Sequence, residues 1–183
     1  MAISTDPVPR VVTLPGLHGS DSRHWQSWLE TQFPESVRVN QADWSAPEID
    51  TWTRAAVAVF SRLDEPYVVA AHSFGCLATV QALQSDFPNI VGVVLVAPAS
   101  PSKFDIQSLN RRRLPVASVV VASNTDPWMS ANEARDLAQD WGSAYINLGD
   151  AGHINVDSGY GPFPYVKELT SVLFARALAA TAA

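Results

Sequence analysis

The sequence is poor in cysteine and in charge, and it has no long apolar run. Among 183 residues there is one cysteine, Cys76, which excludes an internal disulfide and a multi-thiolate zinc site. Charged residues make up 16% of the chain, and eighteen acidic against twelve basic residues give a net charge of −6. Domains that bind nucleic acid carry a basic face, so no nucleic-acid partner is expected.

Two further absences concern localisation. No apolar stretch approaches the twenty residues that a membrane-spanning helix needs, and Met1–Arg10 lacks the basic and apolar regions of a secretory signal. A hydrophobic content of 47% is typical of a globular protein. We therefore expect one domain over residues 1–183, cytoplasmic and without membrane contact.

Short valine-rich runs alternate with longer stretches of helical period. The expected strands are 11–14, 37–41, 67–71, 90–96, 116–123 and 144–148. The expected helices are one capped by Asp21 or Ser22, and then about 51–63, one starting directly after Ser73, about 130–141 and about 165–180. This alternation predicts an α/β fold with a mostly parallel sheet of six to seven strands and helices on both faces.

Ser73 stands where the third strand ends and a helix begins at once. Its neighbours two positions away, Ala71 and Gly75, are small, as a sharp strand-to-helix turn requires. Such a turn would expose the hydroxyl above the sheet and is typical of a nucleophile elbow, although glycine is commoner where Ala71 stands. An ordinary helix N-cap is the alternative reading of Ser73.

A serine nucleophile needs a base, and histidine suits that role near neutral pH. His153 follows the last strand in a glycine-containing loop and is the predicted base. His72 is expected to point away from the nucleophile and to be structural. His24 is expected to be exposed on the first helix.

The base must be oriented by an acid. Asp126 follows the fifth strand, and the order Ser73, Asp126, His153 is the order found in α/β hydrolases. An ordinary turn is the alternative for Asp126. Asp150 and Asp157 are rival acids, but both are very near His153 in the sequence.

The loop after the first strand contains glycine but no phosphate-binding signature. We predict that the backbone N–H groups of Leu17 and Phe74 form an oxyanion hole. His18 and Trp128 are expected to line the pocket. No metal and no cofactor is expected.

Other residues are assigned to packing or to solvent. Four tryptophans on helical faces are expected to pack in or near the core: Trp25, Trp28, Trp52 and Trp141. The triplet 111–113 of arginines is expected to be solvated, and Cys76 to be a buried small hydrophobe.

Several tracts of the chain, together covering most of residues 11–175, resemble one group of enzymes. The tracts are 14–16, 43–47, 71–75, 122–127 and 152–159. The chain resembles the small serine hydrolases typified by retinoblastoma-binding protein nine and its bacterial relatives, within the α/β-hydrolase superfamily. The resemblance implies an α/β-hydrolase fold without a large lid, and it implies the same three residues as nucleophile, acid and base.

The residues and the resemblance together predict a serine hydrolase that cleaves small esters or related acyl compounds. Amide bonds are an alternative that the same residues could cleave. The only insertion-like segment, 98–115, is too short for a large lid, so short acyl chains are expected. The alternative function is a protein-binding module with weak or vestigial activity, whose protein partner the sequence leaves unknown.

Overall fold

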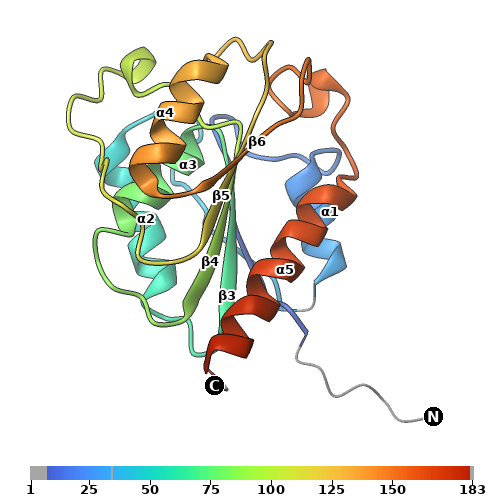
Figure 1. The fold of residues 1–183 in the computed structure, drawn as a ribbon. Helices are drawn as coiled ribbons and strands as arrows, with labels where there is room; N and C mark the ends of the chain where they lie inside the picture. Colours follow the sequence, from blue (N-terminus) through green and yellow to red (C-terminus); the bar gives the residue numbers. More distant parts are fainter. Residues whose placement is uncertain (1–7, 34, 182–183) are drawn as a thin grey trace.

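The computed structural model describes residues 8–33 and 35–181, so the prediction about a secretory signal over residues 1–10 falls largely outside the described residues. Six strands form one parallel sheet in the order β2-β1-β3-β4-β5-β6 (Figure 1). The strands are β1 Val11–Leu14, β2 Val37–Arg38, β3 Tyr67–His72, β4 Ile90–Val96, β5 Ser118–Ala122 and β6 Ala144–Asn147. The helices are α1 Trp25–Gln32, α2 Ile49–Phe60, α3 Phe74–Ala82, α4 Ala131–Trp141 and α5 Pro164–Thr181, with short 3-10 turns η1 Pro101–Phe104 and η2 Val156–Ser158.

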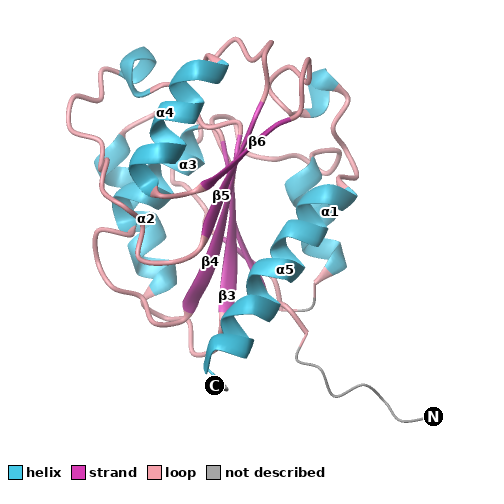
Figure 2. Ribbon diagram, in the orientation of Figure 1, coloured by secondary structure: helices cyan, strands magenta, loops and turns pink. Residues whose placement is uncertain are grey.

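Helices cover both faces of the sheet, as the sequence predicts. Figure 2 shows α2, α3 and α4 on one side and α1 and α5 on the other. Alternate residues of β3 supply the two cores: Val69 and Ala71 pack toward the first group, whereas Val68 and Ala70 pack toward the second. A strand buried on both faces is apolar throughout, which explains the valine-rich runs.

The predicted strands all form, but three of them are shorter than expected, and the last of these, 144–148, loses one residue. The second prediction, 37–41, reduces to Val37–Arg38 because β2 is an edge strand that pairs only with β1. The fifth prediction, 116–123, reduces to Ser118–Ala122, where pairing with β4 and β6 exists. The predicted α/β class, a parallel sheet with helices on both faces, is confirmed, with six strands among the described residues.

The first helix does not begin as predicted. Neither Asp21 nor Ser22 caps α1; the N-cap is His24, whose side chain accepts from the backbone N–H of Gln26. Asp21 is occupied elsewhere, since its carboxylate accepts hydrogen bonds from the backbone and the guanidinium of Arg23. The second helix also begins two residues early, at Ile49.

A buried glutamine attaches α1 to the sheet. The Gln26 side-chain amide donates to the carbonyls of Leu14 and Ala70, at 3.0 and 2.9 Å, and its oxygen accepts from the Ser20 hydroxyl at 2.7 Å. These bonds satisfy a polar group that is fully buried. They also fix the start of α1 beside the ends of β1 and β3.

The assignments to packing and solvent are confirmed. Trp25, Trp52 and Trp141 are at most 1% exposed, and Trp28 packs partly buried against the core on the α1 side. Residues 111–113 are exposed. Cys76 is buried, and this burial raises the pKa of its thiol well above the usual value.

Candidate active site

Ser73 occupies a strained corner between β3 and α3. Its φ of 53° and ψ of −123° lie outside the regions that L-residues normally adopt, and such a conformation costs about 1–3 kcal/mol. The Ser73 side chain makes no cap hydrogen bond to α3. Ser73 therefore occupies the N-cap position without capping the helix through its side chain, and the hydroxyl is directed elsewhere.

Two glycines let the loop after β1 approach this corner. A Cβ at Gly75 would lie 2.4 Å from the Leu14 carbonyl oxygen and 2.5 Å from that of Pro15, and neither backbone atom can easily move. A Cβ at Gly16 would lie 2.7 Å from the Ser73 Cβ. Glycine at both positions is required for the two segments to pack this closely.

The structure brings the three predicted residues Ser73, His153 and Asp126 together. The Ser73 hydroxyl lies 2.9 Å from His153 Nε2, and His153 Nδ1 lies 2.9 and 3.0 Å from the two Asp126 carboxylate oxygens. Because a carboxylate accepts, Nδ1 carries the proton and Nε2 accepts from the serine. The rival acids, Asp150 and Asp157, are both exposed.

Hydroxyl groups join the loop of Asp126 to the loop of His153. The Ser123 hydroxyl accepts from the backbone N–H of Ala151 at 3.0 Å, and the Thr125 hydroxyl accepts from that of Gly152 at 3.0 Å. Ser158 accepts from the backbone N–H of His153 at 3.0 Å. These bonds hold acid and base in register, although they come from separate loops.

The predicted oxyanion donors lie beside the serine. No carbonyl or side chain in the described part of the chain accepts from the backbone N–H of Leu17 or of Phe74. The next amide along the loop, that of His18, is already engaged by the Trp44 carbonyl at 2.9 Å. Phe74 is the first residue of α3, where the helix dipole favours negative charge.

A cavity of about 180 Å³ opens above Ser73 and His153. The predicted lining residues His18 and Trp128 both border it. Six residues that were not predicted to line the cavity also border it: Gly16, Gly19, His24, His72, Phe104 and Asn155.

The expectation that His24 is exposed is wrong. His24 is 5% exposed, because it precedes α1 as its N-cap and its ring packs 4.9 Å from that of His72. Burial, the largest cause, lowers its pKa from 6.5 to about 4, so the ring is neutral at pH 7. Because aspartate and serine are among the preferred N-cap residues and histidine is not, the sequence did not indicate that His24 would cap α1.

His72 is structural, as predicted, but it also borders the cavity. Its Nε2 lies 2.9 Å from the His153 carbonyl oxygen and therefore donates to it, while the two rings lie 4.8 Å apart. Burial lowers the pKa of His72 well below its usual value. A neutral ring here positions the backbone of His153 without adding a positive charge beside it.

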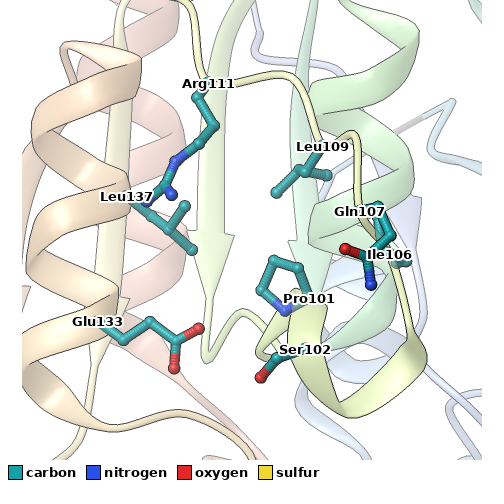
Figure 3. Close-up of a pocket in the computed structure, with 8 residues that line it drawn as sticks. All are labelled: Pro101, Ser102, Ile106, Gln107, Leu109, Arg111, Glu133 and Leu137. Carbon is teal, nitrogen blue, oxygen red and sulfur yellow. The ribbon is translucent and has the colours of Figure 1, made fainter.

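A second cavity, of about 250 Å³, lies apart from these residues. Figure 3 shows it between the segment after β4 and α4, with Arg111 and Glu133 among the side chains at its edge. None of the predicted catalytic or oxyanion residues lines it. It is larger than the first cavity, but the reactive groups are in the first.

A parallel sheet with a serine at the strand-to-helix corner, hydrogen-bonded to a histidine and through it to an aspartate, defines an α/β hydrolase. The chain belongs to the serine hydrolase family, which residues 11–171 match. It is an enzyme of that class.

Several relatives share this architecture. A YdeN-like protein of Pectobacterium atrosepticum is 37% identical, with a TM-score of 0.83 over 91% of this chain and 93% of that one. The Bacillus subtilis YdeN protein is 23% identical over 91% of this chain and 97% of its own length. The esterase Est2 of Thermogutta terrifontis, solved with butyrate bound, is 12% identical with a TM-score of 0.65 over 93% of this chain and 84% of that one, a likeness of fold alone.

Residues 8–33 and 35–181 lack two kinds of structure. No helix there is both long and apolar enough to cross a membrane. No three histidine, cysteine or acidic side chains gather there as metal ligands would.

The buried His24 makes stability depend on pH. His24 has a pKa near 6.5 in the unfolded chain, whereas burial lowers its pKa to about 4 in the folded chain. The neutral ring therefore contributes its full stability when the pH is above the pKa of His24 in the unfolded chain. This stability is lost as the pH falls toward the pKa of His24 in the folded chain. Between pH 7 and 4.5 we expect His24 to lower the free energy of unfolding by about 2–3 kcal/mol.

Urea unfolding of the wild type and of His24→Ser at both pH values measures this term. Serine keeps an N-cap oxygen but does not titrate. On acidification the free energy of unfolding of the wild type should fall by about 2–3 kcal/mol more than that of the variant. Equal losses in the two proteins would contradict the assignment.

Proposed function

We propose that this enzyme hydrolyses small carboxylic esters with Ser73 as nucleophile, His153 as general base and Asp126 as the orienting acid. The observation that carries the proposal is the continuous hydrogen-bonded series from the Ser73 hydroxyl through both nitrogens of His153 to Asp126, with 2.9 Å at each step. A serine hydroxyl is a weak nucleophile unless a base can take its proton at this distance. The burial of the Asp126 side chain, 2% exposed, favours a strong interaction with the imidazolium that forms.

The reaction follows from this arrangement in two halves. His153 Nε2 takes the hydroxyl proton as Ser73 Oγ bonds to the ester carbonyl carbon. His153 then gives that proton to the alcohol oxygen as the carbon–oxygen bond breaks, which leaves an acyl-serine. Water, deprotonated by His153, releases the carboxylic acid and restores the hydroxyl.

The negative charge on the tetrahedral intermediate requires donors. The free backbone N–H groups of Leu17 and Phe74 are the proposed oxyanion hole, supported by their lack of partners in the described residues and by the start of α3 at Phe74. Gly16 and Gly75 allow the two segments that carry these donors to meet. No step in this scheme uses a metal or an organic cofactor.

Labelling by a fluorophosphonate probe tests the proposal directly. We expect one equivalent of probe on Ser73, located by mass spectrometry, and none on folded Ser73→Ala, because only an activated serine attacks the probe. Absence of labelling in folded wild-type protein would overturn the proposal. It would favour the alternative of a protein-binding module, which the resemblance to retinoblastoma-binding protein nine suggests.

The acid is tested by a matched pair of aspartate variants. Asp126→Asn should lower kcat by about 10⁴-fold while the protein stays folded, because an amide cannot hold the His153 ring in the required tautomer. Asp150→Asn, a change at an exposed position in the loop of His153, should leave kcat nearly unchanged. The reverse pattern in p-nitrophenyl ester assays would show that Asp150 is the acid.

The small cavity supports a preference for short acyl chains. The rings of Phe104 and Trp128 lie 5.9 Å apart and both line the cavity, and the buried ring of Phe74 packs behind Phe104 at 4.9 Å. A chain longer than the cavity leaves methylenes in water and forgoes about 0.8 kcal/mol for each. Phe104 comes from η1, within the short segment that stands in place of a lid.

Truncation of Phe104 should change this preference. We expect kcat/KM of the wild type to fall as p-nitrophenyl esters lengthen from butyrate to decanoate. Phe104→Ala should move the optimum toward longer chains, whereas Phe104→Leu, which keeps most of the wall, should not. A wild type that prefers the decanoate would refute the short-chain assignment.

A further inference from the structure

Two hydrogen-bond donors in the cavity are not used by the proposed reaction. The first belongs to His24. Its Nδ1 accepts from the backbone N–H of Gln26 at 3.2 Å, and a backbone N–H can only donate. The proton of the neutral ring must therefore be on Nε2, and no group in the described part of the chain accepts from that nitrogen.

The second donor belongs to Asn155. Its side-chain oxygen accepts from the backbone N–H of Ser158 at 3.1 Å and from the Ser158 hydroxyl at 3.0 Å. The backbone N–H of Ser158 can only donate, so the atom of the Asn155 amide that faces it must be the oxygen. The NH₂ group of Asn155 then points away from this turn, and it too has no acceptor among the residues described.

Both side chains border the same cavity as Ser73, and the other lining residues define its character. Leu17, Phe104 and Trp128 supply its large hydrophobic side chains, and the imidazoles of His18, His72 and His153 supply further polar groups. A substrate that enters displaces water from the two donors, and a buried donor left without a partner costs more than a hydrogen bond gains. A purely hydrocarbon ester would leave both N–H groups unpaired.

We propose that His24 Nε2–H and Asn155 Nδ2–H bind an oxygen acceptor on the substrate, so that the preferred substrates are short oxygenated esters. The acceptor is an ether, hydroxyl or carbonyl oxygen in addition to those of the scissile ester. This inference rests on the proposed hydrolase function, and it makes His24 and Asn155 specificity-determining residues.

The rigidity of both donors favours this role. His24 is fixed by its cap bond to α1 and by the contact of its ring with that of His72. Asn155 is fixed by the two bonds from Ser158, which also holds the backbone of His153. Donors held in one orientation distinguish substrates better than mobile ones, because no ordering cost opposes the bond.

Matched substrate pairs test the inference. p-Nitrophenyl methoxyacetate and p-nitrophenyl butyrate differ by one oxygen in place of a methylene on the acyl side. The butyrate esters of 2-methoxyethanol and of butanol differ in the same way on the alcohol side. For each pair the ratio of kcat/KM, oxygenated over hydrocarbon, is corrected for the ratio of the alkaline hydrolysis rates.

Two variants remove one donor each and keep the local structure. His24→Ser retains an N-cap oxygen, and Asn155→Asp retains the acceptor that Ser158 requires. In at least one substrate pair each variant should lower the corrected ratio about tenfold relative to the wild type. A general structural defect, or a changed charge near His153, would lower both members of a pair together and leave the ratio unchanged.

Asn147→Asp is the matched control for the added charge. Asn147 is exposed on β6, and its oxygen likewise accepts from a backbone N–H, that of Gly149. This variant should retain the wild-type ratio. Unchanged ratios for both His24→Ser and Asn155→Asp, in both substrate pairs, would overturn the inference while ester hydrolysis itself stood. Failure of the proposed function would instead show as no hydrolysis of any of the four esters.

Discussion

The close approach of the loop after β1 to the corner at Ser73 is the constraint on which the rest of the site depends. Gly75 allows the corner to rest on the carbonyls of Leu14 and Pro15, and Gly16 allows the loop to pass beside the serine. The same approach brings the amide of Leu17 next to that of Phe74. A side chain at either glycine would separate the two proposed donors as well as the two segments.

The remaining parts of the site are held by main-chain hydrogen bonds to hydroxyls, in addition to the apolar packing of Ala151 and Ile154 on either side of the base. Ser123 and Thr125, after β5, accept from the amides of the loop that carries His153. His72, at the end of β3, donates to the His153 carbonyl. Hydrogen bonds thus link the loop of His153 to the end of β3 and to the segment after β5, and each of these bonds is made by an uncharged side chain. A neutral surrounding matters because a positive charge beside His153 would oppose formation of the imidazolium during the reaction.

Much of the fold and three residues of the site could be predicted from the sequence. Runs of valine identify buried parallel strands, and strand ends identify where polar residues meet; this was enough to select Ser73, Asp126 and His153. It was not enough for His24 and Asn155. Their roles depend on tautomer and amide orientation, which are set by Gln26 and Ser158 through contacts that leave no periodic signal. The end of β2 was also unpredictable, since an edge strand stops where its single neighbour does.

The choice of histidine to begin α1 is informative because it is not the choice that stability alone would make. Serine or aspartate would cap the helix as well, without placing in the interior a ring whose neutrality must be maintained. Histidine adds something that neither offers: Nδ1 accepts a hydrogen bond from the first turn of the helix, while Nε2 of the same ring presents a donor to the cavity. Active sites commonly retain such costly groups where local rules would prefer others. The same reasoning applies to the strained φ of Ser73, which also lies where the chemistry is proposed.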